Sequence, residues 1–257
     1  MNKEGRIALI TGGSRGIGQA IALQLASEGC HIAFCARGNE FIEETLSKIQ
    51  FYGVKAYGAV ADVTKQDQLE KFIQQSTEKL GKIDFLVCNA GGVFGKGLLE
   101  STPSDWEQTF QLNLFHCVNT IRLCVPLMNQ QGGGSILLIA SISGTKPQPK
   151  AQYGCAKAAQ IYLAKSLAYE LAPYNIRINA LSPGSTIFPN GGWEKFQANN
   201  PELFAQFAEQ EFPQGRLATL PEIAKVATFV LSDRASWING ANIPVDGAQL
   251  SPSALGY

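Results

Sequence analysis

Short runs of apolar and β-branched residues alternate along most of the chain with longer segments whose apolar residues recur every three or four positions. The longer segments predict helices, and Ile17, Ile21 and Leu25 form one apolar face of the first. The short runs predict strands at residues 6–11, 31–36, 55–60, 83–88, 135–140, 176–181 and 241–245. Such alternation is typical of βαβ units. We therefore expect an α/β fold, a single doubly wound Rossmann-type domain over 1–257, with a seven-stranded parallel sheet and helices on both faces.

One segment interrupts this alternation. Between residues 182 and 216 no strand is predicted, and prolines and glycines separate two short helical stretches, 193–198 and 201–211. A long insertion in a compact domain often serves function. We therefore expect a substrate lid at 185–216, with a surface excursion of no function as the alternative.

The composition narrows the classes of function. The chain has 257 residues, of which 45% are hydrophobic and 16% charged, and this balance excludes a disordered chain. The 21 basic and 21 acidic residues cancel, so no net field favours nucleic acid as a partner. No stretch of about 18 apolar residues predicts a membrane span. Residues 1–6 are polar, so the cytoplasm is the expected location.

The cysteines predict no metal site. Six are present without a C-x-x-C pair, and the chain has only two histidines, His31 and His116. We therefore expect neither a zinc site nor a disulfide framework. Most of the cysteines lie in apolar runs such as 86–88, where a free thiol packs as a small hydrophobic group.

The loop after the first predicted strand is the first candidate site. It reads Thr11-Gly12-Gly13-Ser14-Arg15-Gly16-Ile17-Gly18 and leads into a helix. Glycines let backbone amides approach a diphosphate closely, and the helix N-terminus favours an anion. The spacing differs from the G-x-G-x-x-G fingerprint, so a glycine-rich turn without a ligand stays the alternative.

The end of the second predicted strand indicates which dinucleotide binds. Many dinucleotide folds place an acid there, which binds the ribose 2′-hydroxyl. Here Ala36 is neutral and Arg37 follows. A guanidinium pairs with a 2′-phosphate, and Arg15 can join it, so the sequence favours NADP(H) over NAD(H). A solvated arginine at a strand end is the competing interpretation.

Four further residues are candidates for catalysis. Tyr153 and Lys157 open a long amphipathic helix and lie four apart, on one face. A nearby ammonium can stabilise the ionised form of a tyrosine that exchanges a proton. Ser141 closes the fifth predicted strand, at the sheet edge where ligands bind, and Asn113 lies within a helix predicted from about 103 to 128. Either of the last two, taken alone, is more typical of a structural residue.

Together these residues resemble the short-chain dehydrogenase/reductase family over nearly the whole chain. The matching motifs are, in order, Thr11-Gly12 with Gly16 and Gly18, Asp62-Val63, Asn89-Ala90-Gly91, Asn113, Ser141, Tyr153 with Lys157, Pro183-Gly184, and residues 240–247. Two departures stand out. Cys88 takes the place of a common asparagine, and the loop from Ser141 to Tyr153 is one residue shorter than the commonest spacing, which makes Ser143 an alternative to Ser141.

The resemblance implies a role for each matching residue. Tyr153 would be the general acid or base, Lys157 would lower the tyrosine pKa and hold the nicotinamide ribose, and Ser141 would orient the carbonyl. Asn113 would anchor a water in the proton relay. The remaining cofactor contacts would come from the glycine loop with Arg37, from Asp62 and Val63 at the adenine, and from Asn89, Ala90, Gly91, Pro183, Gly184 and Thr186.

These observations predict an NADP(H)-dependent oxidoreductase that interconverts a ketone and a secondary alcohol. A sugar-nucleotide epimerase or dehydratase of the extended branch would be longer, with a different glycine spacing. A non-catalytic NADP-sensing regulator would be expected to lack Tyr153 or Lys157, and both are present.

The nearest-looking group is the 3-oxoacyl-[acyl-carrier-protein] reductases, which have arginines near the ends of two core helices. Residues 128–131 and 172–175 stand there and contain no basic residue, so we expect a free or coenzyme-linked small-molecule ketone to be the better substrate. Surplus apolar residues on the helices that begin near 103 and 152 indicate a homotetramer, since the resemblance makes that surface a four-helix interface.

Overall fold

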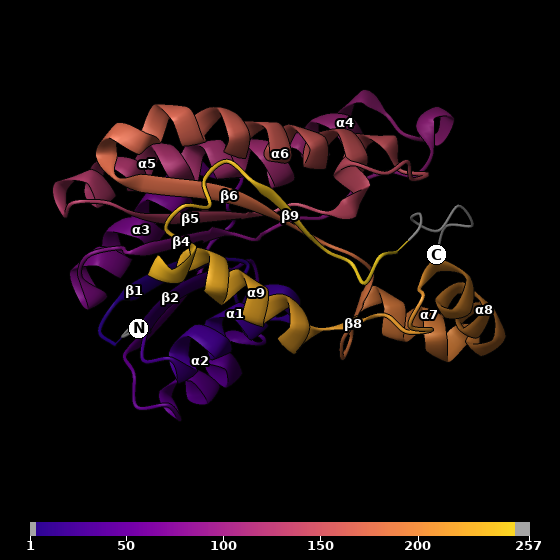
Figure 1. Cartoon of the computed structure of the whole chain (residues 1–257), viewed down its shortest axis with the longest axis horizontal. Coiled ribbons are helices and arrows are strands. Elements are labelled where there is room, and N and C mark those ends of the chain that lie inside the picture. The colour runs from indigo at the N-terminus through magenta and orange to yellow at the C-terminus, as the bar shows by residue number, and fades with distance from the viewer. Residues whose placement is uncertain (1–3, 250–257) are drawn as a thin grey trace.

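A parallel seven-stranded sheet in the order β3-β2-β1-β4-β5-β6-β9 forms the centre of the protein (Figure 1). The computed structural model describes residues 4–249. The strands of this sheet are β1 (Ile7–Thr11), β2 (His31–Ala36), β3 (Ala56–Val60), β4 (Phe85–Cys88), β5 (Gly134–Ile139), β6 (Ile176–Pro183) and β9 (Asn242–Val245). The seven predicted strands and the doubly wound α/β fold are confirmed.

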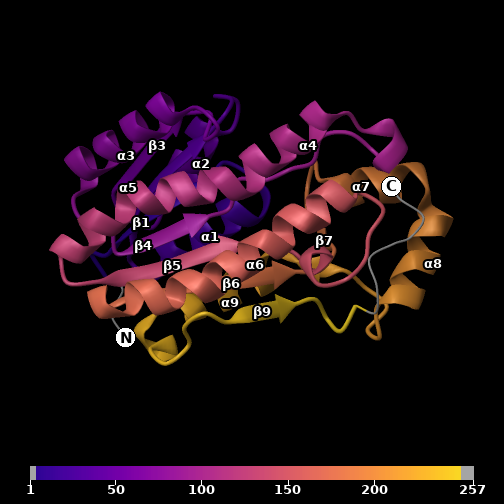
Figure 2. The same cartoon turned by 90° about the horizontal axis from the view of Figure 1, so that it is seen from above.

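Helices cover both faces of the sheet (Figures 1 and 2). On one face lie α1 (Gly16–Ser27), α2 (Ile42–Gln50) and α9 (Leu220–Leu231), and on the other α3 (Gln66–Leu80), α5 (His116–Gln130) and α6 (Ala151–Leu171). Because successive strand side chains point to opposite faces, Leu9 joins one core and Ile10 the other. Within residues 4–249, no helix has the length and apolar character to cross a membrane.

The order of the strands reverses between β1 and β4. The chain runs from β1 through β2 to β3 at one edge, and then returns to place β4 on the other side of β1. In open α/β sheets, ligands bind at such a switch point, outside the carboxyl ends of the strands. Thr11 pairs with Cys88 and Cys88 with Leu138, so β1, β4 and β5 end side by side there.

The helix predicted over 103–128 is interrupted. A capping box of Thr102 and Asp105 starts α4 (Pro103–Phe110), a π-helical turn comes next at Gln111–Phe115, and α5 continues from there. A π turn accommodates one extra residue and rotates the next part of the helix, and such turns are frequent at functional sites. Asn113 lies in the middle of this one.

The expected lid contains a strand that we did not predict. The strand β7 (Thr186–Ile187) precedes the helices α7 (Gly192–Asn199) and α8 (Pro201–Glu211). It pairs with β8 (Ala218–Thr219), which follows them. The expectation of no strand between 182 and 216 was therefore wrong, because two residues carry no alternation pattern and their partner lies outside the segment. The helices form a separate unit at one end of the molecule (Figure 1), where Trp193 stacks on Phe207 with ring centroids 4.4 Å apart.

Candidate active site

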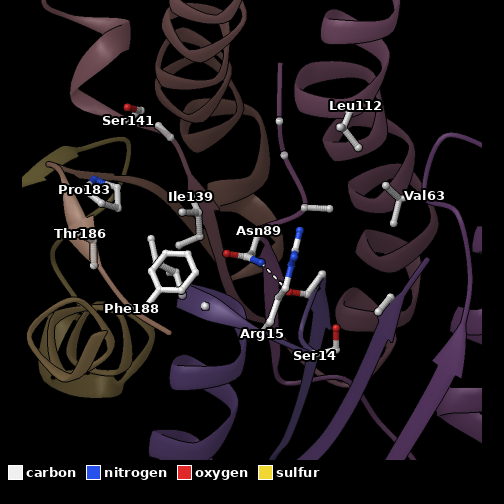
Figure 3. A pocket seen from close by; sticks show the side chains of 18 of the residues that line it. Ser14, Arg15, Val63, Asn89, Leu112, Ile139, Ser141, Pro183, Thr186 and Phe188 are labelled. Atoms are coloured by element: carbon white, nitrogen blue, oxygen red, sulfur yellow. Dashed lines mark hydrogen bonds between the residues drawn. The ribbon is translucent and has the colours of Figure 1, made fainter. Parts of the chain in front are cut away.

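A cavity of about 590 Å³ opens at the carboxyl ends of the central strands. Side chains from the glycine loop, from the ends of β4 and β5 and from the lid face it (Figure 3). Most of the predicted site residues line it: Gly12, Ser14, Arg15, Gly16, Ile17, Arg37, Val63, Asn89, Ala90, Gly91, Ser141, Tyr153, Lys157, Pro183, Gly184 and Thr186. Gly18, Asp62 and Asn113 are not among the lining residues.

The glycine loop has the shape that a diphosphate requires. Gly12 and Gly16 have φ of +67° and +57°, a conformation that favours glycine. A Cβ on Gly18 would collide with the Gly12 carbonyl and the Asn89 amide, so Gly18 permits close packing behind the loop. Asn89 Nδ2 donates to that same carbonyl at 2.8 Å. The amides at the start of α1 are thereby held open toward the cavity, which fits a dinucleotide diphosphate.

The end of the cavity beside β2 carries charges of both signs. The two candidate arginines, Arg15 and Arg37, line it together with Glu40, which no sequence pattern singled out. Val63 faces the cavity beside them. Asp62 instead accepts hydrogen bonds from the amide and the hydroxyl of Thr64 at 2.9 and 2.8 Å, and this fixes the turn after β3.

Tyr153 and Lys157 lie on the first turns of α6 and face the cavity. Lys157 Nζ stands 5.5 Å from the centre of the Tyr153 ring and donates to the Ile139 carbonyl at 2.8 Å. The lysine is 2% exposed, and this burial lowers its pKa to about 8, while nearby Cys117 acts in the opposite direction. Lys157 is thus held rigidly at the end of β5, where its charge acts on the tyrosine with little screening.

Two serine hydroxyls lie at the end of β5. Ser141 Oγ accepts from the Ser143 amide at 3.1 Å, at the start of a short 3₁₀ turn, Ile142–Gly144. Both serines line the cavity together with Tyr153. The two alternatives for the hydroxyl that orients a carbonyl therefore share one small turn.

Asn113 lies beneath the cavity, fully buried. Its Nδ2 donates to the carbonyls of Gly92 and Thr109, each at 2.7 Å, and its Oδ1 accepts from the Gly92 amide at 3.3 Å. Its backbone carbonyl accepts from Gln160 Nε2 at 2.8 Å and from Cys117 Sγ at 3.1 Å. Asn113 thereby connects the loop after β4 to helix α6.

The structure gathers polar residues around Asn113 that no sequence pattern connects. The sulfurs of Cys88 and Cys117 and a ring nitrogen of His116 lie within 4.8 Å of one another, and all three residues are buried. Cys117 Sγ is 3.8 and 3.6 Å from the two ring nitrogens, so it stands over the imidazole ring rather than in line with a lone pair. His116 Nε2 lies 3.4 Å from the Thr11 hydroxyl. Only the adjacency of His116 and Cys117 in the sequence could have signalled this cluster.

Two aromatic side chains of the lid, Phe188 and Trp193, reach the cavity beside Ser185 and Thr186. A Cβ on Gly16 would lie 3.2 Å from the Phe188 ring, so this ring rests on the glycine loop (Figure 3). The other lid aromatics, Phe196, Phe204 and Phe207, pack around Trp193. These three rings therefore hold the lid together and do not line the cavity.

Comparison with known proteins agrees with this geometry. The family model described as "Enoyl-(Acyl carrier protein) reductase" matches residues 12–248. The chain is 34% identical over 248 residues to the 3-oxoacyl-[acyl-carrier-protein] reductase FabG of Thermotoga maritima, covering 96% of this chain and 98% of that protein. The protein therefore belongs to the short-chain dehydrogenase/reductase family and is an oxidoreductase of that class.

Two solved structures show how closely the fold is shared. L-Sorbose reductase from Gluconobacter frateurii, complexed with NADPH and L-sorbose, superposes with a TM-score of 0.91 at 30% identity, covering 98% of this chain and 100% of that one. NAD+-bound xylitol dehydrogenase gives a TM-score of 0.90 at 30% identity, covering 96% and 100%. Similar proteins thus bind either nicotinamide cofactor.

Proposed function

We propose that this protein is an NADP(H)-dependent oxidoreductase that reduces a ketone or oxidises a secondary alcohol by hydride transfer. One observation carries the proposal: Tyr153 and the buried Lys157 face the same cavity as a glycine loop shaped for a diphosphate. When bound, the nicotinamide supplies the hydride.

The chain's own residues move the proton. Tyr153 donates it to the carbonyl oxygen during reduction, and Ser141 holds that oxygen by a hydrogen bond. The Lys157 ammonium stabilises the negative charge that develops on the tyrosine, and an interaction of this kind at about 5 Å and an effective dielectric of about 20 contributes about 3 kcal/mol. Gly91 and Pro183 form walls beside these groups.

The preference for NADP(H) rests on Arg37 and Arg15 at the adenosine end. A single charge-assisted hydrogen bond to a 2′-phosphate contributes about 1.5 to 3 kcal/mol, so NADPH should bind at least about tenfold more tightly than NADH. Fluorescence titration of wild type and Arg37→Gln tests this, since the variant should lose the preference. If NADH binds as tightly as NADPH to wild type, Glu40 is serving the ribose hydroxyls and the enzyme uses NAD(H).

The substrate end of the cavity favours a substrate whose reacting part is uncharged. Ser141, Ile142, Ser143, Trp193 and Gly92 line it without an ionised side chain. The alternative is a 3-oxoacyl-[acyl-carrier-protein] reductase, which the similarity to FabG of Thermotoga maritima supports. The helix ends at 128–131 and 172–175 lack basic residues for an acidic carrier, and for this reason we place a free or coenzyme-linked ketone first.

We also infer a cytoplasmic homotetramer. The six cysteines are free, and those in the cluster around His116 have sulfurs within 4.8 Å of each other, which fits a reducing compartment. Phe115 in the π turn and Tyr162 on α6 are 44% and 72% exposed, and they form an apolar area that a second copy would cover. Leu112, in the same π turn as Phe115, is buried within the subunit and does not add to this area.

A further inference from the structure

Gln160 has no role in the mechanism above, yet it lies in the middle of the polar network. It is fully buried on α6, one helical turn after Lys157. Its Nε2 donates to the Asn113 carbonyl at 2.8 Å and lies 3.0 Å from Cys117 Sγ. Its Oε1 is buried and accepts no hydrogen bond from any residue in the described range 4–249.

The Asn113 carbonyl is fully occupied. A backbone carbonyl oxygen has two lone pairs, and this one accepts from both Gln160 Nε2 and Cys117 Sγ. The family resemblance gives Asn113 the task of anchoring a relay water. In this chain the carbonyl has no lone pair left for that water.

The orientation of the Gln160 amide follows from the same contact. Exchanging its nitrogen and oxygen would bring Oε1 against the Asn113 carbonyl oxygen, and two acceptors repel. The oxygen is therefore the end without a partner. An unpaired buried acceptor costs free energy, and native structures keep few of them without a reason.

Gln160 and Lys157 lie on the same side of α6. Residues three apart on a helix share a face, as Lys157 and Gln160 do. Lys157 Nζ and Asn113 Oδ1 both lie next to Gly91, since a Cβ added to this glycine would be 3.4 Å from the first and 2.9 Å from the second. Cys117, which contacts Gln160, is near enough to act on the charge of Lys157.

We propose that Gln160 Oε1, in place of the Asn113 carbonyl, anchors the water that returns protons to Lys157. Gln160 is then a positioning residue, and this role rests on the proposed function. During carbonyl reduction one proton leaves Tyr153, one passes from Lys157 toward Tyr153, and one passes from solvent through the bound water to Lys157. No other bond changes in this relay.

A crystal structure of the NADPH complex at high resolution tests the placement without any substrate. We expect an ordered water within hydrogen-bond distance of both Gln160 Oε1 and Lys157 Nζ. A water on the Asn113 carbonyl with Gln160 turned away, or no water at Oε1, would overturn the proposal. Because this measurement needs no turnover, it separates a failure here from a failure of the proposed ketone reductase activity.

Kinetics of Gln160→Met and Gln160→Glu test the role. We expect Gln160→Met to keep its NADPH affinity within about twofold and to lose about 10- to 100-fold in kcat. Its solvent deuterium isotope effect should rise, since proton delivery becomes slow. Gln160→Glu in its neutral acid form can donate its O–H to the Asn113 carbonyl and keep the other oxygen as an acceptor, so it should recover most of kcat at low pH and lose it as the carboxyl ionises, because two acceptors then face each other.

Gln131→Met is the matched control. Gln131 also donates to a backbone carbonyl, that of Ile83, and also has a buried unpaired Oε1, but it lies after the C-terminal end of α5 and does not line the cavity. It should leave kcat and the isotope effect unchanged. An unchanged isotope effect in Gln160→Met, or an equal loss in Gln131→Met, would show that the buried amide has only a structural role.

Discussion

The charge of Lys157 should set the upper pH limit of carbonyl reduction. Its Nζ stands 5.5 Å from the centre of the Tyr153 ring. At an effective dielectric of about 20, a unit charge at that distance stabilises the developing tyrosinate by about 3 kcal/mol, which corresponds to a factor of about 100 in rate. Replacement by methionine keeps the volume of the side chain and removes the charge. Lys157→Met should therefore lose up to about 100-fold in kcat at pH 7 when NADPH is saturating.

The pH profile identifies the cause of that loss. Burial lowers the pKa of Lys157 to about 8, so the ammonium is present below that pH and disappears above it. Wild-type kcat for reduction should consequently fall as the pH rises through about 8. In Lys157→Met this decrease in kcat should be absent, because the group that titrates has been removed.

The assay is steady-state NADPH oxidation with a ketone found by screening. It runs from about pH 5.5 to about 9.5, a range that brackets the lysine pKa. NADPH affinity is measured separately by fluorescence. Lys165→Met is the control, because Lys165 is an exposed lysine on the same helix and should change neither kcat nor the profile. A decrease in kcat near pH 8 that persists in Lys157→Met would refute the assignment of this decrease to Lys157. A variant in which KM changes while kcat keeps its wild-type value would refute it as well.

Three further outcomes are expected. Tyr153→Phe should abolish nearly all turnover while NADPH still binds, because it removes a transition-state proton; retention of most of kcat would mean that another group is the acid. The acetoacetyl coenzyme A thioester should give a higher kcat/KM than an acetoacetyl carrier protein; the reverse order with strong salt dependence would restore the carrier-protein interpretation. Light scattering at micromolar concentration should give the mass of a tetramer, and Tyr162→Glu should lower it; a monomeric wild type would contradict the assembly.

The strands could be predicted because the sheet is covered on both faces. Strands buried in this way appear as short continuous apolar runs such as Ile7–Thr11, and the predicted bounds differ from the observed ones by no more than two residues. That the glycine loop, Arg37, Tyr153 and Lys157 would line one cavity could be predicted, because each can be located from local spacing. Each lies where a strand ends or a helix begins, and the fold brings those places together at the switch point.

Features that depend on packing between distant segments could not be predicted. The π turn at Gln111–Phe115 leaves no periodic signature, because one extra residue in a helix resembles ordinary variation in the apolar pattern. The convergence of Cys88 with His116 and Cys117 requires β4 and α5 to be packed together. Gln160 appears in the sequence as one polar residue on an amphipathic helix, and only the fold shows that it faces inward.

The π turn explains how one residue can connect both halves of the site. Asn113 holds the loop after β4 through Gly92 with its side chain, and holds α6 through Gln160 with its carbonyl. In a regular α-helix that carbonyl would accept a hydrogen bond from the backbone amide four residues later, so it would be less available to a neighbouring helix. Here the carbonyl belongs to the π turn and accepts from Gln160 Nε2 on the neighbouring helix. The loop after β4 that lines the cavity and the helix that carries Tyr153 are therefore positioned by the same residue, and loss of the Asn113 side chain should weaken NADPH binding as well as turnover.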